Sequence, residues 1–86
     1  MTTTQIRVKF AEDLTLQAPG TIVEVFYGDD TAPSERTIHI GDGVVLGRDL
    51  NDGEYFTASY DRDGRFVGGS SSRGEFSAEV LQALDA

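Results

Sequence analysis

Three Asp-Gly dipeptides, spaced ten or eleven residues apart, place the strongest constraint on the fold of this 86-residue chain. They are Asp42-Gly43, Asp52-Gly53 and Asp63-Gly64. Such pairs favour tight hairpin turns, because Asp and Gly tolerate the positive φ that these turns require. Turn signals at this spacing are typical of a meander of short antiparallel strands. The strands predicted around them cover residues 37–40, 44–50, 54–60 and 65–68.

The last of these turns also indicates its register. A two-residue turn at Asp63-Gly64 would place Arg62 opposite Arg65, and like charges on opposed strands repel each other. A three-residue loop of residues 62–64 instead places Asp61 opposite Arg65, and cross-strand pairs of opposite charge are favoured. We therefore predict the three-residue loop.

The first 20 residues show the alternation of a strand with one buried face. Apolar side chains at positions 6, 8 and 10 alternate with basic ones at positions 7 and 9. Residues 14–16 are expected to extend this strand after a bend. A turn is predicted at residues 18–20, because Pro19 presets φ and Gly20 accepts a positive φ.

Segment 21–27 combines β-branched and aromatic residues and is expected to be the most buried strand. Val23, Val25 and Tyr27 share one face of it, whereas Ile22 and Phe26 share the other. Apolar side chains on both faces are typical of a strand that is covered on both sides. The polar segment 28–36 that follows is predicted to be an exposed loop.

The C-terminal part changes from strand to helix periodicity. Residues 68–74 are rich in Gly and Ser and are expected to form a flexible linker. A helix is predicted over residues 76–85, with Ser77 as its N-cap and Phe76 and Leu81 in the positions of a hydrophobic staple. Because a helix this short is unstable alone, its apolar stripe is expected to pack on the sheet.

These patterns predict a mainly β (α+β) fold in a single domain that spans residues 1–86. The expected architecture is a small antiparallel meander, sandwich or partial barrel of about five to six strands over residues 5–70. One short C-terminal helix over residues 76–85 completes it. A chain of this length builds one modest hydrophobic core.

Residues suited to catalysis or to metal binding are few. The chain has no cysteine and one histidine, His39, so a zinc site would need mostly carboxylate ligands. His39 alternates with Ile38 and Ile40 and is expected on the more polar face of the sheet, as a structural or exposed residue. The serines at 70–72 have no base nearby in the sequence to activate them. We therefore expect no enzymatic activity, no cofactor and no metal site, with a weak cation site in the Asp-rich loops left as an alternative.

The net charge of −8 indicates which partners the surface favours. Residues 1–43 hold seven acidic and three basic residues, a net −4, and residues 44–86 hold eight and four, again −4. A surface that is negative throughout repels nucleic acids and anionic membranes and attracts basic protein surfaces. We therefore expect no direct contact with nucleic acid or membrane. The N-terminus has neither the basic start nor the apolar stretch of a secretory signal.

The first functional hypothesis is a non-enzymatic, acidic protein-binding module. Its carboxylates would imitate a phosphate backbone and occlude a basic, nucleic-acid-binding site on a partner protein, which would make it an inhibitor. Small phage-encoded inhibitors of nucleic-acid-handling proteins have a similar size and charge. The expected location is the cytoplasm. The candidate contact residues are Asp29, Asp30 and Glu35 on the long loop, and Asp49, Asp52, Glu54, Asp61 and Asp63 near the hairpin turns.

The alternative hypothesis is a structural or assembly subunit, such as a component of a phage virion or tail. Such a subunit would self-associate or dock on neighbouring chains through exposed strand edges and loops. Its expected location is the virion. Clustering of the acidic residues on one part of the surface would favour the binding module, and self-association would favour the subunit.

Overall fold

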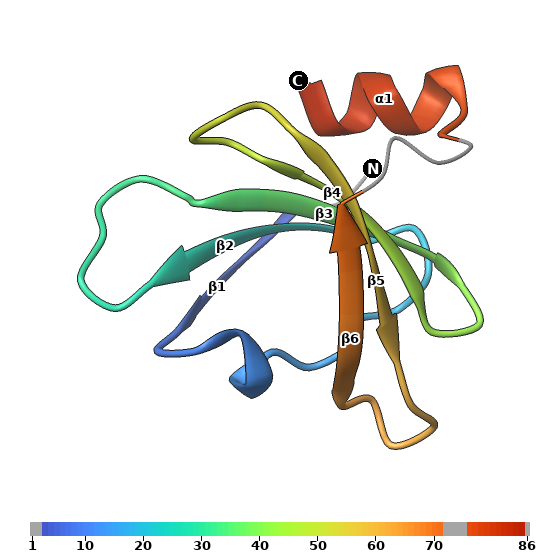
Figure 1. Cartoon of the computed structure of the whole chain (residues 1–86), viewed down its shortest axis with the longest axis horizontal. Coiled ribbons are helices and arrows are strands. Elements are labelled where there is room, and N and C mark those ends of the chain that lie inside the picture. Colours follow the sequence, from blue (N-terminus) through green and yellow to red (C-terminus); the bar gives the residue numbers. More distant parts are fainter. Residues whose placement is uncertain (1–2, 72–75, 86) are drawn as a thin grey trace.

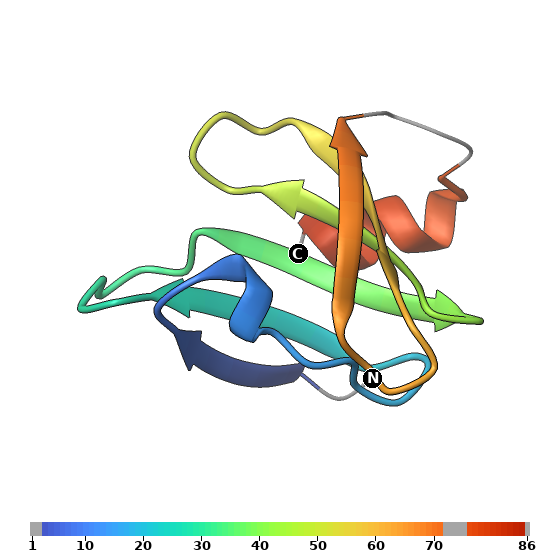
Figure 2. The same cartoon turned by 60° about the horizontal axis from the view of Figure 1, so that its bottom comes forward.

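The computed structural model describes residues 3–71 and 76–85, which form one six-stranded sheet with an α-helix packed on one face (Figure 1). The elements are β1 (Thr3–Val8), the 3-10 helix η1 (Ala11–Asp13), β2 (Ile22–Tyr27), β3 (Glu35–Gly41), β4 (Val44–Asp49), β5 (Tyr55–Tyr60), β6 (Phe66–Ser71) and α1 (Ala78–Asp85). The strands follow one another across the sheet in chain order, from β1 at one edge to β6 at the other (Figure 2). The predicted mainly β fold with a short C-terminal helix is confirmed. In the described residues, no helix has the length and apolar character to cross a membrane.

One pair of strands departs from the predicted antiparallel meander. β1 pairs with β2 in parallel, whereas the other four pairs are antiparallel. Parallel neighbours need a crossover connection in place of a hairpin. Residues 9–21, which we call the crossover, supply this connection and contain η1. The prediction that residues 14–16 extend the first strand is therefore wrong.

The crossover connects the two edges of the twisted sheet. β1 and β6 do not pair with each other. Instead, Thr15 forms a β-bridge with Arg65, and the Leu16 N–H donates to the Gly64 carbonyl at 3.0 Å. Figure 2 shows the crossover passing over one face of the sheet, while α1 lies on the other. Among the described residues, the two edge strands are thus not paired with each other, and the crossover and α1 each cover one face of the sheet.

Each face of the sheet carries its own apolar cluster. The cluster under α1 comprises Ile22, Ile38, Leu46, Ala83 and Leu84. The cluster under the crossover comprises Leu14, Val23 and Val25. β2 contributes to both clusters, so the two apolar faces predicted for segment 21–27 are confirmed, as is the docking of the helix on the sheet.

The predicted turns and the predicted helix cap are present. Asp42 and Gly43 both have positive φ, 55° and 76°, as a two-residue type I′ hairpin requires. The Asp61 N–H donates to the Arg65 carbonyl at 2.9 Å, which closes the predicted three-residue loop. At the start of α1, the Ser77 Oγ accepts a hydrogen bond from the Val80 N–H at 3.2 Å. These local features follow from residues that are close together in the chain.

β6 is longer than predicted. Residues 68–71, expected to belong to the flexible linker, continue the strand and pair with residues 56–59 of β5. Backbone pairing with β5 therefore outweighs the low strand propensity of Gly. The register shifts at Val67, which lies between the pairs Tyr60–Phe66 and Ser59–Gly68 as a bulge. Residues 72–74 of the predicted linker lie outside the described residues.

Candidate functional site

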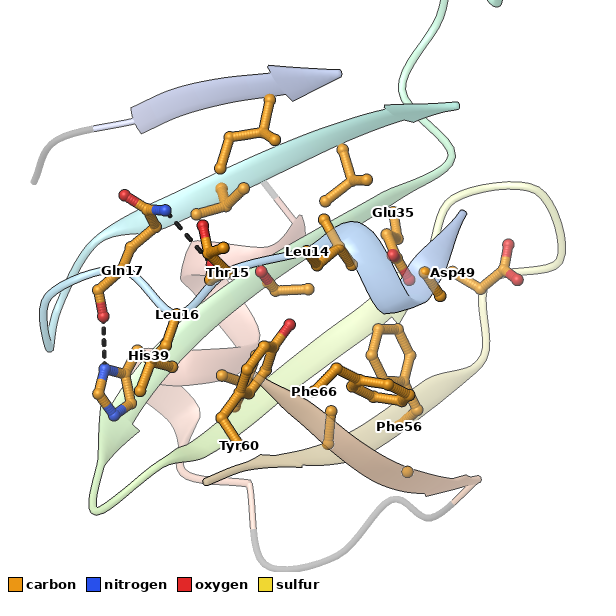
Figure 3. Close-up of a pocket in the computed structure, with 18 of the residues that line it drawn as sticks. Leu14, Thr15, Leu16, Gln17, Glu35, His39, Asp49, Phe56, Tyr60 and Phe66 are labelled. Atoms are coloured by element: carbon orange, nitrogen blue, oxygen red, sulfur yellow. Dashed lines mark hydrogen bonds between the residues drawn. The ribbon is translucent and has the colours of Figure 1, made fainter. Parts of the chain in front are cut away.

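A cavity of about 340 Å³ lies between the sheet and the crossover, on the face opposite α1 (Figure 3). Strand residues form one wall, because alternate side chains of a strand point to the same face. Leu14 and Leu16 of the crossover form the opposite wall. The connection that makes β1 and β2 parallel therefore also encloses this space.

Carboxylates gather at one end of the cavity. Glu35 and Asp49 occupy paired positions on β3 and β4 and lie together at this end (Figure 3). Asp52 and Glu54 of the following loop are exposed and also line the cavity. The cavity therefore reaches the molecular surface beside them. In residues 3–71 and 76–85, no Lys or Arg lines it.

Glu35 is half-buried and has an aromatic partner. Its Oε1 accepts a hydrogen bond from the Tyr27 hydroxyl at 2.7 Å. Burial raises the pKa of Glu35, the Tyr27 hydrogen bond opposes this rise, and the neighbouring Asp49 charge adds to it. Burial also raises the pKa of the Tyr60 hydroxyl, to which the Glu35 charge contributes. In the part of the chain that the structure describes, neither ion pair involves Glu35.

We expect Glu35→Gln to stabilise the protein at neutral pH. The folded state holds the Glu35 proton more tightly than the unfolded state, so the free energy of unfolding falls as pH rises above the unfolded-state pKa of about 4.3. Gln carries no charge and can still accept the Tyr27 hydrogen bond. Thermal unfolding should show a Tm several degrees higher than wild type at pH 7, with the gain disappearing below about pH 4.

Glu79→Gln is the matched control, because Glu79 is exposed on α1 at the opposite face. Its charge lies in the first turn of α1, where the helix N-terminus favours it, so this variant should have an unchanged or slightly lower Tm at pH 7 and no gain at any pH. A Glu35→Gln gain that persists at low pH, or equal shifts in both variants, would contradict the desolvation of Glu35.

Five aromatic residues line the same cavity: Tyr27, Tyr55, Phe56, Tyr60 and Phe66. The Tyr60 and Phe66 rings pack edge to face, with their centroids 5.8 Å apart. The Phe56 ring lies over Gly47 of β4: a Cβ at position 47 would be 2.7 Å and 2.8 Å from the two Phe56 Cε atoms. Glycine at position 47 therefore leaves room for the Phe56 ring on this face.

His39 closes the opposite end of the cavity (Figure 3). Its Nε2 accepts a hydrogen bond from the Gly43 N–H at 3.2 Å, and its Nδ1 lies 2.7 Å from the Gln17 carbonyl oxygen. Because Nε2 accepts, the proton of a neutral ring is on Nδ1 and is donated to Gln17. With 7% of its surface exposed, His39 is a structural residue that joins the crossover to the β3–β4 turn.

The eight acidic residues predicted as partner contacts fall into two groups. Successive hairpin loops of an antiparallel sheet lie at opposite ends of it, so every second loop lies at the same end. The β2–β3 and β4–β5 loops therefore share one end and the β5–β6 loop lies at the other, as Figure 1 shows. Asp61 and Asp63 belong to the second group. We call the first group the acidic end; it comprises Asp29, Asp30, Glu35, Asp49, Asp52 and Glu54.

Glu35 differs from the prediction in its surroundings, whereas Asp49 lies beside the β4–β5 turn as predicted. Glu35 was expected on an exposed loop, but it begins β3 and is half-buried. The prediction is wrong here because β3 starts two residues earlier than the sequence pattern indicated, to pair with β2 and β4. Asp49 ends β4, and its Oδ1 accepts the Asn51 N–H at 2.8 Å, so it also stabilises its own loop.

The arginines on the strands that lead to the acidic end are engaged in internal contacts. Arg36 binds Glu24 at 3.1 Å, and this hydrogen bond holds the pKa of Glu24 below its usual value. Arg48 binds Asp85 at 3.0 Å. Arg7 donates to the carbonyls of Gly28 and Asp30 at 2.6 Å and 2.9 Å. The side chains of Asp29, Asp30, Asp52 and Glu54 remain exposed.

The cavity itself was missed by the sequence analysis. Its aromatic residues come from β2, β5 and β6, and the crossover encloses them. One signal was present: Phe56, Ala58 and Tyr60 alternate along segment 54–60, which places all three on one face. That pattern indicates a shared face but not an enclosed space.

No family model, curated protein or solved structure matches this chain significantly. Within the described residues, no group of three or more His, Cys, Asp or Glu side chains is arranged to hold a metal ion. The acidic end and the cavity that opens beside it are the two candidate features of the described residues.

Proposed function

We propose that this chain is a non-enzymatic binding module that recognises a basic surface of a partner protein through its acidic end. The gathering of six acidic residues at one end of the sheet carries this proposal. Residues 28–34 and 50–54 contain Asp and Glu but no Lys or Arg, so the loops present mainly negative charge, of which the Arg7 guanidinium beside the Gly28 and Asp30 carbonyls offsets a part. Opposite charges on two surfaces steer their encounter over a screening length of about 8 Å at physiological salt.

The proposed partner is a nucleic-acid-binding protein, whose basic site the acidic end occludes. Lys and Arg side chains that bind phosphate oxygens also bind carboxylate oxygens, because both are anionic hydrogen-bond acceptors. A set of carboxylates on two neighbouring loops can therefore occupy a site built for a phosphate backbone. Occlusion of that site makes this chain an inhibitor, and the cytoplasm is its proposed location.

Two double substitutions at opposite ends of the sheet test this proposal. Asp29→Asn/Asp30→Asn removes two charges from the acidic end, and Asp61→Asn/Asp63→Asn removes two from the other end. Asn at position 61 keeps an oxygen for the loop hydrogen bonds that Asp61 accepts. Each variant is immobilised, lysate of the source cell is applied, and bound protein is eluted with a salt gradient and identified by mass spectrometry.

Wild type and Asp61→Asn/Asp63→Asn should capture the same nucleic-acid-binding protein and release it sharply as salt rises. Asp29→Asn/Asp30→Asn should capture about tenfold less, equivalent to a loss of about 1.4 kcal/mol of binding free energy. The purified partner should then lose oligonucleotide binding when this chain is added. Equal capture by the two variants, or release that does not depend on salt, would contradict the proposal.

A structural subunit is the second candidate, and the free edge of β1 favours it. β1 pairs with β2 on one side, and no other described strand pairs with its outer side, which is therefore a candidate for strand addition. The outer edge of β6 is interrupted by the bulge at Val67, which hinders regular pairing with another chain. Sedimentation equilibrium over a range of concentrations distinguishes the candidates. Self-association that persists in high salt favours the subunit, and a monomer at all concentrations counts against it.

A further inference from the structure

The cavity is large enough for a small ligand and has a definite charge preference. Its volume of about 340 Å³ lies at the lower end of the range for small-molecule sites. Among the described residues, its ionisable lining consists of carboxylates, three tyrosines and His39, with no Lys or Arg. Both His39 nitrogens are engaged by backbone groups. The carboxylates of this cavity would therefore repel an anionic ligand, whereas they would attract a cationic ligand.

Glu35 is the group that most needs such compensation. Its carboxylate is partly withdrawn from water, which is unfavourable for a charge without a positive partner. The Tyr27 hydroxyl occupies only part of its acceptor capacity, because an ionised carboxylate offers about four lone-pair sites. Glu35 can therefore accept further N–H donors from a group that enters the cavity.

The aromatic lining complements a cation with an apolar stem. Faces of Tyr and Phe rings carry negative potential and attract a cation within about 6 Å of the ring centre. The Tyr60 ring points toward the middle of the cavity, near Phe66 (Figure 3). Phe56 is held on the same side by its position over Gly47. An aliphatic stem can pack against these rings while its charged head group reaches Glu35.

We propose that this cavity binds an organic cation, with an ammonium or guanidinium head group beside Glu35 and an aliphatic stem against the aromatic rings. A Lys or Arg side chain of the partner protein has this chemistry, and so does a free aliphatic amine. Because Asp52 and Glu54 line the cavity at the surface, a side chain that meets the acidic end can enter here. If the cation is a Lys or Arg side chain of the partner, this proposal rests on the proposed function. It then adds the type of residue that the partner inserts into the cavity.

NMR titration of the ¹⁵N-labelled chain at neutral pH tests the cavity without any partner. The cationic probes are n-butylammonium and n-butylguanidinium, and the matched neutral and anionic probes are n-butanol and butanoate. The cations should cause saturable shifts of the backbone amides of Glu35, Phe56 and Tyr60, whereas butanol and butanoate should not. Equal binding of butanol and butylammonium, or shifts confined to the exposed acidic loops, would overturn the proposal.

Variants then assign the contacts. Glu35→Gln is expected to fold, and it should weaken butylammonium binding about tenfold, whereas Glu79→Gln on the opposite face should bind as wild type does. Phe56→Leu keeps an apolar side chain but removes an aromatic ring, so it should weaken butylammonium binding about threefold or more. Unchanged affinity in both Glu35→Gln and Phe56→Leu would overturn the site.

Capped tripeptides Gly-Lys-Gly and Gly-Arg-Gly identify the source of the cation. Tighter binding of a tripeptide than of butylammonium assigns the site to a partner side chain, and equal or weaker binding assigns it to a free amine. Both outcomes support a cation site. Loss of cation binding with intact capture at the acidic end overturns the cavity proposal alone. If cation binding is intact but Asp29→Asn/Asp30→Asn and Asp61→Asn/Asp63→Asn capture the partner equally well, only the proposed partner surface is overturned.

Discussion

Leu84→Ala is expected to lower the free energy of unfolding by about 2–5 kcal/mol, the usual cost of removing a buried Leu side chain. Leu84 has no exposed surface and packs among Ile22, Ile38 and Leu46 of the sheet. Its loss removes apolar contacts and leaves a cavity that a rigid sheet does not fill. Because small domains have total stabilities near the low end of about 5–15 kcal/mol, this variant should lose a large part of its stability and unfold at a markedly lower temperature than wild type.

Leu81→Ala on the same helix is the control, since Leu81 is only half-buried. Leu81→Ala should lower the free energy of unfolding markedly less than Leu84→Ala does. Urea denaturation followed by circular dichroism measures both losses. Equal losses for the two variants would contradict the central place of Leu84 between α1 and the sheet.

His39→Phe is expected to cost about 1–3 kcal/mol, because two partly buried backbone groups lose their hydrogen-bond partner. The Gln17 carbonyl and the Gly43 N–H both bind the His39 ring, and a phenyl ring offers neither of them a partner. The crossover should then loosen over the cavity that it covers. A chemical denaturation curve measures the loss of stability, and amide hydrogen exchange at Gly43 reports the broken hydrogen bond directly.

His39→Gln gives the comparison, because a side-chain amide keeps both a donor and an acceptor. It should recover part of the lost stability and part of the protection at Gly43. Gly43 exchange that stays at the wild-type rate in His39→Phe would contradict the structural role of His39.

The features that the sequence predicted are those decided by neighbouring residues. The Asp42-Gly43 turn needs only two residues that tolerate positive φ, and the Ser77 cap needs only an oxygen before an apolar stripe. The loop after Asp61 likewise forms because its carboxylate accepts N–H groups two and four residues ahead. Such contacts have the same geometry in many folds, so a local pattern is sufficient to predict them.

The features that the sequence did not predict depend on contacts between distant segments. Residues 14–16 fit the alternation of a strand, but Thr15 bridges Arg65 and Leu16 binds Gly64, fifty residues or so along the chain. The parallel pairing of β1 with β2 follows from that route. The enclosed cavity follows from it as well, so neither could be inferred from periodicity.

The acidic end could be predicted only in part, because it depends both on local turns and on contacts between distant segments. Once the hairpins are assigned, antiparallel pairing places the loops around Asp29 and Asp52 at one end and the loop around Asp63 at the other. The division of the acidic residues could therefore be read from the turn positions. The surroundings of Glu35 could not, since its burial depends on Tyr27 from another strand and on the crossover above it.

A stability cost at Glu35 agrees with a role in binding. Residues that serve recognition often reduce the stability of the free protein, because they present groups that only a ligand satisfies. A Tyr or Phe ring beside an uncompensated carboxylate is such an arrangement. If Glu35→Gln both stabilises the free protein and weakens cation binding, one variant will show that Glu35 lowers stability and contributes to binding.

The most direct test of the proposed function is NMR mapping of the labelled chain with the captured partner. Addition of the partner should shift or broaden the backbone amides of residues 28–35 and 49–54 and leave those of residues 61–65 unchanged. Excess salt should reverse these changes, because exposed charges carry the contact. Perturbation confined to the outer edge of β1, or to the loop around Asp63, would contradict recognition through the acidic end.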